Sequence, residues 1–233
     1  MARTFIERSA KLCFGFASLV GILTDTSIMS AQYPSRPQIS TDGTAVLLED
    51  YVSLPLSGPT HGGKGPGAVD FKLQLGRVMS LRSEPADAPL AASRFFVDDQ
   101  SSTLYILDKT AKKFTPYLNF ADVFPKFVSD TGNTAGISSI AFDPGYAKNG
   151  KFYTVHVEKP DIEGSANPTN AKLSTLKLDG YATTPVVSPP AGPLHLESVL
   201  IEWTDSNIRN ATFEGTAREI LRVGFDRDRK SVV

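Results

Sequence analysis

The sequence predicts an all-β fold, and three observations support this. Glycine (18) and proline (16) make up about one residue in seven of the 233, which favours a turn-rich chain over a helical bundle. Short segments alternate apolar and polar residues, the period of a half-buried strand. Turn-forming clusters such as Asp143-Pro144-Gly145 and Lys148-Asn149-Gly150 separate them. Many short strands punctuated in this way are typical of a sandwich, a barrel or a propeller.

The N-terminal residues 1–31 have the pattern of a secretory signal peptide. An uncharged apolar run covers residues 12–23, and cleavage is expected after Ala31. The run is too short to cross a bilayer comfortably, so we expect no stable membrane span and keep an anchor as the alternative. The only cysteine would be removed with the signal, which suits an oxidising compartment and predicts a periplasmic or secreted protein. The basic residues that precede the run are Arg3, Arg8 and Lys11.

Residues 32–67 are rich in proline, glycine and serine and predict an irregular arm. Within the arm, the sequence of residues 58–65 (GPTHGGKG) partly matches the phosphate-binding P-loop motif. That motif needs a serine or threonine after the lysine and a helix that begins there. Here Lys64 is followed by Gly65-Pro66-Gly67, so we do not predict phosphate binding.

The β pattern begins at residue 69, because apolar and polar residues alternate over 69–75. Residues 94–98 and 103–107 predict a hairpin around the polar turn Asp99-Gln100-Ser101-Ser102. A single helical turn is expected near 120–127. The further predicted strands are residues 136–142, 151–157, 172–178, 197–203 and 219–223.

Composition excludes several classes of function. The hydrophobic share of 41% is enough for a core in one domain or two small ones. A formal charge of −1 gives no electrostatic case for nucleic acid or an anionic membrane as partner. One cysteine excludes an internal disulfide framework and a cysteine-rich zinc site, and three histidines leave little for a histidine metal centre.

Three stretches are similar to a known family. They are residues 94–120 (RFFVDDQSSTLYILDKTAKKFTPYLNF), 136–156 (GISSIAFDPGYAKNGKFYTVH) and 197–225 (ESVLIEWTDSNIRNATFEGTAREILRVGF). Together they resemble the soluble glucose/sorbosone dehydrogenases, which are sugar dehydrogenases that bind pyrroloquinoline quinone (PQQ). The most specific part is Ala141-Phe142-x-Pro144-x-Tyr146, followed by Asn149-Gly150. It resembles the family's strand–turn–strand signature.

The resemblance implies a six-bladed β-propeller, of which residues 68–227 would form roughly the first three blades. It implies oxidation of an aldose or related sugar at C1, with PQQ as hydride acceptor, calcium as its metal partner, and a cytochrome or quinone as electron acceptor. The alternative is a non-catalytic propeller that binds a ligand or another protein, since a fold alone does not fix a function.

The chain departs from the family pattern in three places. The family's catalytic histidine follows the strand that resembles residues 220–223, and no such segment is present, so we expect no catalytic residue here and an inactive fragment. Residues 228–233 (DRKSVV) match the translation of a common sequencing adapter and are predicted to be an artefact. Thr134 stands where the family often has glutamine or glutamate, and we assign it as a channel-side cofactor contact. Asp143 stands where the signature commonly has histidine.

The remaining candidate side chains favour structural roles. His156 lies on the face of its predicted strand with Phe152 and Thr154, and we expect it to pack there. His61 and His195 lie in predicted loops. Asp98 and Asp99 could bind calcium, but adjacent acids at a turn more often form the turn, so no metal site is predicted.

Overall fold

The computed structural model describes residues 49–55, 76–129, 135–188 and 195–226. The predicted signal peptide, the P-loop-like segment, the strand at 69–75, Thr134 and residues 228–233 therefore lie outside the described residues. The regular secondary structure of the described part is nearly all strand, which confirms the all-β prediction. Within it, no helix is long and apolar enough to cross a membrane.

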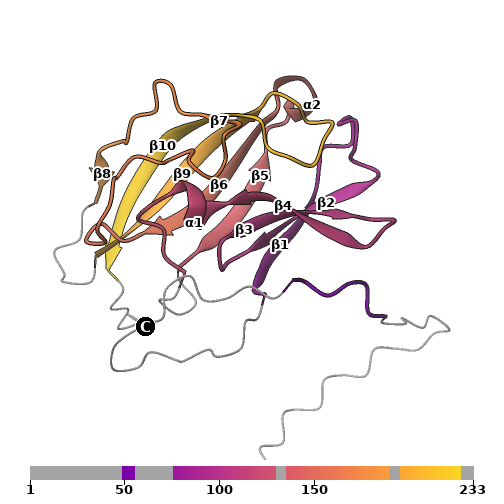
Figure 1. The fold of residues 1–233 in the computed structure, drawn as a ribbon, viewed down its shortest axis with the longest axis horizontal. Helices are drawn as coiled ribbons and strands as arrows, with labels where there is room; N and C mark the ends of the chain where they lie inside the picture. The colour runs from indigo at the N-terminus through magenta and orange to yellow at the C-terminus, as the bar shows by residue number, and fades with distance from the viewer. Residues whose placement is uncertain (1–48, 56–75, 130–134, 189–194, 227–233) are drawn as a thin grey trace, which may run out of the picture. The chain divides into compact units, whose positions relative to one another are not determined.

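The first sheet, sheet A, is a four-stranded antiparallel meander in which neighbours in the chain are neighbours in space (Figure 1). Its central hairpin, β2 and β3, confirms the predicted one. Strand β1 was not predicted, because its apolar residues Val78, Met79 and Leu81 are exposed and do not alternate with buried positions. Strand β4 was not predicted, because it contains Pro116. A proline is tolerated there because β4 is an edge strand of the sheet. The strands are β1 (Val78–Ser83), β2 (Arg94–Asp99), β3 (Thr103–Asp108) and β4 (Lys113–Asn119).

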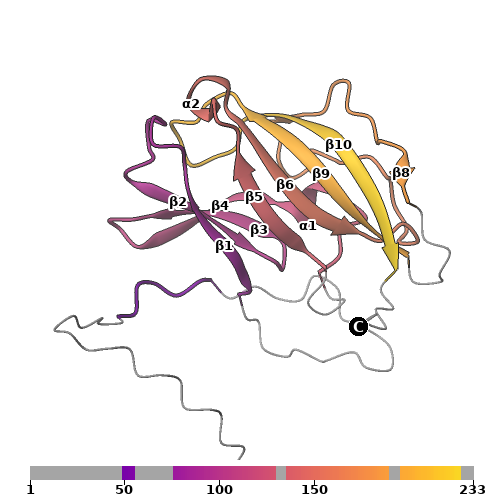
Figure 2. The same ribbon diagram turned by 180° about the vertical axis from the view of Figure 1, so that it is seen from behind.

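The second sheet, sheet B, repeats this plan with four antiparallel strands in chain order, which lie side by side in Figure 2. Two short strands, β7 and β8, pair in parallel with the outer strand β10. The four main strands are β5 (Ile137–Phe142), β6 (Lys151–Glu158), β9 (His195–Asp205) and β10 (Gly215–Asp226), and the short ones are β7 (Leu176–Lys177) and β8 (Val186–Val187).

Most predicted strands of sheet B are confirmed, and β9 and β10 extend beyond the predicted bounds at both ends. The predicted strand at 172–178 is wrong except for the two residues of β7. Here the chain makes successive turns, with Leu173 N–H donating to Asn170 O and Leu176 N–H donating to Leu173 O at 3.0 Å each. The segment contains apolar residues because its leucines pack on the core, where Leu176 is fully buried.

Two single-turn helices complete the described elements. Helix α1 (Phe120–Val123) confirms the expected turn, and Asn119 caps it by accepting a hydrogen bond from Ala121 N–H at 3.1 Å. Helix α2 (Tyr146–Asn149) ends at Gly150, which has a φ of +65°. A left-handed residue after a helix is usually glycine, so the Asn149-Gly150 pair serves as the helix end and as the turn into β6.

The main core lies between the two sheets. Phe96 of sheet A meets Phe142 of sheet B edge to face at 5.1 Å between ring centres. Trp203 stacks on Phe152 at 6.2 Å and meets Phe213 at 5.4 Å. Such offset and edge-to-face pairs are favourable beyond the area that they bury.

The two sheets are aligned at one end, which we call the start end because β1 and β5 begin there side by side. The pairing of β1 with β2 places the β2–β3 turn at this end, and the pairing of β5 with β6 places the last residues of β6 there. Ile137 N–H donates to Gln100 O at 3.2 Å and joins the sheets directly. The start end therefore collects residues that are far apart in the sequence.

Candidate functional site

Buried polar side chains gather at the start end, where they form two groups. The first is the aspartate turn, residues 98–103, whose six side chains are all polar or charged and all buried. The second, the arginine cluster, consists of His156, Glu158, Glu197, Glu219 and Arg222, which are also buried. Charged residues are seldom buried unless they are paired, so the partners of each group decide what it can do.

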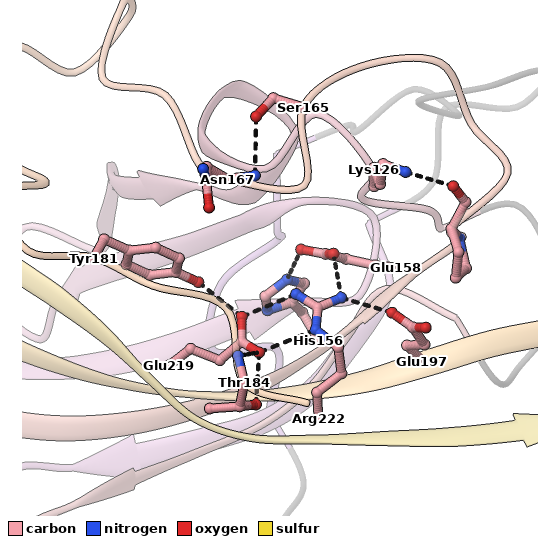
Figure 3. A network of polar contacts seen from close by, with 11 residues as sticks. Lys126, His156, Glu158, Ser165, Asn167, Tyr181, Thr184, Glu197, Glu219 and Arg222 are labelled. Atoms are coloured by element: carbon pink, nitrogen blue, oxygen red, sulfur yellow. Dashed lines mark hydrogen bonds and ion pairs between the residues drawn. The ribbon is translucent and has the colours of Figure 1, made fainter. Parts of the chain in front are cut away.

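Arg222 is the centre of the arginine cluster (Figure 3). Its Nη1 donates to Glu158 Oε2 and Glu197 Oε2 at 2.7 Å each. Its Nε and Nη2 form a fork on the carboxylate of Glu219 at 3.0 and 2.9 Å. The guanidinium thereby joins β6, β9 and β10, and its planar set of donors suits this arrangement better than a lysine would.

A bulge in β10 makes the fork possible. In a regular strand, residues three apart point to opposite faces. The register of β10 against β9 shifts between Glu219 and Leu221, so Ile220 is an extra residue. Glu219 and Arg222 are consequently buried on one face, while Ile220 and Leu221 between them are both exposed. Bulges commonly redirect side chains in this way.

His156 belongs to the cluster but is inaccessible. Its Nε2 lies 3.1 Å from Glu158 Oε1, and the ring packs 4.2 Å from that of Phe124. Phe120 and Phe127 also lie against it. The side chain is 0% exposed, which confirms the predicted packing role and leaves no path to a substrate. Its Nδ1 is buried without a hydrogen-bond partner among the described residues.

The cluster is strongly polarised. Burial would raise the pKa of Glu158, but hydrogen bonds from His156 and the charge of Arg222 lower it below the ordinary value. Burial would likewise raise the pKa of Glu219, but Arg222 and Thr184 lower it below the ordinary value. The pKa of Arg222 lies well above its ordinary value despite burial, because its carboxylate partners favour the charged form. Three carboxylates thus face one guanidinium, an environment that disfavours an anionic ligand.

The aspartate turn has a structural role. Asp98 Oδ1 accepts from Ser80 N–H and Ser80 Oγ–H at 2.6 Å each. Asp99 Oδ1 accepts from Arg77 N–H at 2.8 Å and Ser101 N–H at 3.1 Å. These contacts agree with the turn-forming interpretation of both acids. The described residues contain no group of three histidine, cysteine or acidic side chains arranged to hold a metal ion.

The sequence-predicted site residues are only partly described. Thr134 and His61 lie outside the described residues, and nothing of the side chain of His195 is described. Gly136 is described. It has a φ of +97°, and a Cβ there would lie 1.9 Å from Gln100 O. The chain therefore enters β5 at a glycine-dependent contact with the aspartate turn.

Asp143, one of the departures from the family pattern, holds the turn before β6. Its Oδ1 accepts from Gly145 N–H at 2.7 Å and from Asn149 Nδ2 at 2.9 Å. These bonds lower the pKa of the carboxyl group, Asn149 being the larger cause. The acid therefore stabilises the signature turn.

A third buried polar group, missed by the sequence interpretation, lies at the opposite end of the sheets. Arg94 Nε donates to Glu84 Oε1 at 3.0 Å, and Tyr146 OH donates to the same oxygen at 3.2 Å. Arg94 Nη2 also donates to Ile208 O at 2.7 Å in the β9–β10 loop. The group links sheet A to sheet B. No local pattern indicates it, because the partners of Arg94 lie 10 and 114 residues from it in the chain.

The described residues do not by themselves fit PQQ, which is an anionic quinone. At the start end, Arg222 is already surrounded by carboxylates, and Arg77 Nη2 donates to Ser129 O at 2.6 Å. We therefore assign neither quinone nor calcium to the described residues. No protein-family model matches the chain, and no curated protein is significantly similar to it.

Proposed function

We propose that sheets A and B are two successive blades of a propeller in a periplasmic or secreted quinoprotein dehydrogenase. The enzyme would oxidise an aldose or related sugar at C1, with PQQ as hydride acceptor and a cytochrome or quinone as electron acceptor. The observation that supports this most directly is the arrangement of the sheets. Each has four antiparallel strands in chain order, and the first strands, β1 and β5, lie side by side. Adjacent propeller blades have this connectivity.

The positions of the family-like residues support the same proposal. The segment from Asp143 to Gly150 joins β5 to β6, as a strand–turn–strand signature requires. Tyr146 is fully buried and its hydroxyl donates to Glu84 in the contact between the sheets. Gly150 has the left-handed φ of +65° that favours glycine directly after a helix.

In this proposal the described residues build the scaffold, and the chemistry belongs to other residues. When bound, PQQ would supply the hydride acceptor, and calcium would be its metal partner. His156 and Arg222 are committed to buried partners, so neither is assigned to the sugar or the cofactor. The base and the cationic quinone ligands are assigned to none of the described residues, and Thr134 remains the proposed channel-side contact.

Two steps test the proposal. The source DNA is first sequenced across the codon for Phe225 and onward, and we expect an open frame that includes a His-x-x-Gly segment. The extended protein is then loaded with PQQ and Ca²⁺ and assayed by dye reduction with aldoses and sorbosone. We expect sugar-dependent turnover that disappears when the segment's histidine is replaced by alanine.

Either step can overturn the proposal. A loaded, folded, extended protein that oxidises no sugar would do so. A frame that continues into further strands without the histidine segment would favour the alternative, a non-catalytic propeller that binds a ligand or protein. The 233-residue chain itself serves as a control, since we expect no quinone-dependent turnover from it.

A further inference from the structure

The chain between β6 and β9 covers part of the outer edge of β10. Residues 176–187, which we call the covering segment, begin with β7 and end with β8 (Figure 1). Strand β7 pairs with Gly215 and Thr216, and β8 pairs with Arg222 and Val223. An uncovered edge strand presents unpaired N–H and C=O groups that can pair with another strand. The covering segment therefore limits access to this edge.

Glu219 holds the middle of the covering segment (Figure 3). Its Oε2 accepts from Tyr181 OH at 3.0 Å. Its Oε1 accepts from Thr184 N–H at 2.9 Å and from Thr184 Oγ–H at 2.8 Å. These three bonds reach the segment between its two short pairings with β10, so one carboxylate connects it to the sheet.

The contacts of Glu219 favour an ionised carboxylate. Its two oxygens accept from Arg222 Nε and Nη2 and from the Thr184 amide, and none of these nitrogens can accept a hydrogen bond. The hydroxyls of Tyr181 and Thr184 could accept from a protonated carboxyl group, but they would then no longer donate to it. Protonation would also remove the charge that pairs with Arg222 and so weaken the fork. Because Glu219 and Arg222 are buried, water cannot readily compensate for that loss.

Other charged groups reach Glu219 through Arg222. Glu158 of β6 and Glu197 of β9 share the guanidinium, and His156 contacts Glu158. The facing titratable group from the covering segment is Tyr181, whose pKa burial and Glu219 raise far above its ordinary value. Tyr181 therefore stays neutral in ordinary buffers, and acid acts on the carboxylates and the imidazole.

We propose that the covering segment is acid-labile. When Glu219 loses its charge, the segment detaches from β10 while the rest of sheet B stays folded, and the outer edge of β10 becomes exposed. This inference does not depend on the proposed redox function. The segment is closed at neutral pH. Since the folded-state pKa of Glu219 is lowered, its contribution is complete above the ordinary carboxyl range and is lost as the pH falls through the folded value.

The test measures amide hydrogen exchange of the full chain at pH 7, before and after Glu219→Gln. We expect protection of the Thr184 amide, whose acceptor is Glu219, to fall about 10- to 100-fold, the range for losing a charge-assisted hydrogen bond. Protection in β6, at Thr154, should stay within about threefold. Glu202→Gln is the matched control, because Glu202 bonds Tyr153, Lys151 and Arg218 outside the covering segment.

A second variant separates the segment from the folding of the cluster. Tyr181→Phe combined with Thr184→Val removes two donors and leaves the Glu219–Arg222 fork intact. We expect faster exchange over residues 178–188 and cleavage by chymotrypsin there, with the β10 amides that pair with β9 still protected. Unchanged protection of Thr184 in either folded variant would overturn the proposal, because β7, β8 and apolar packing would then hold the segment. Loss of protection over all of sheet B together with the segment would also overturn it.

Discussion

Gly150 lies directly against the backbone of Asp205, and a Cβ on Gly150 would come within 2.0 Å of the Asp205 carbonyl oxygen. One hydrogen bond also joins the two residues: Asp205 N–H donates to Gly150 O at 2.9 Å. The end of α2 is thereby placed against the far end of β9. No side chain fits between them.

The first prediction follows from this contact. Gly150→Ala should destabilise the fold by about 2–4 kcal/mol, because it adds a backbone clash to the cost of a left-handed φ. Gly180→Ala is the matched control: its φ is +75°, but nothing lies within 4 Å of an added Cβ. It should cost only about 1–2 kcal/mol. Urea unfolding of both variants measures the difference, and equal losses would contradict the importance of the contact.

The second prediction concerns the indole of Trp203, whose Nε1 donates to Thr154 Oγ1 at 2.8 Å in the core. Thr154→Val keeps the shape but leaves a buried N–H without an acceptor, which should cost about 1–3 kcal/mol. Thr154→Ser retains the hydroxyl and should lose less. Denaturant midpoints followed by Trp203 fluorescence give both values. A valine variant as stable as the serine variant would argue against this bond.

The third prediction compares two arginines. Arg94→Ala removes a buried guanidinium and leaves Glu84 buried without its cation, so we expect a loss of about 3–5 kcal/mol. Arg218→Ala removes an ion pair with Glu202 from a side chain that is 67% exposed. That change should cost at most about 1 kcal/mol. Thermal unfolding at matched pH distinguishes them, and similar losses would refute the linking role given to Arg94.

The fourth prediction uses the buried acid Asp98, whose pKa is raised by burial although Ser80 donates to it. A raised folded-state pKa means that the folded protein binds the proton more tightly, so stability falls as the pH rises through that pKa. Asp98→Asn removes this dependence. The variant should gain stability relative to the parent between pH 4 and pH 7. Unfolding free energies at the two pH values give the comparison, and a constant difference would contradict the prediction.

The sequence by itself determined the local elements. Short strand-forming segments placed β2, β3, β5 and β6, and turn residues placed their connections, because both signals come from residues within a few positions of each other. Asn149-Gly150 marked a turn that the backbone could make only with glycine. The strand face of His156 also followed from the sequence, since a strand has a period of two.

Only the tertiary structure decided where the buried charges meet. Nothing local indicates that Arg94 reaches the β9–β10 loop or that Arg222 gathers acids from three strands. The period of two would place Glu219 and Arg222 on opposite faces, and the bulge at Ile220 reverses that outcome. A bulge depends on the pairing of β10 with β9, a contact between distant segments. Side-chain partners of this kind are fixed by strand register, which no single stretch of sequence contains.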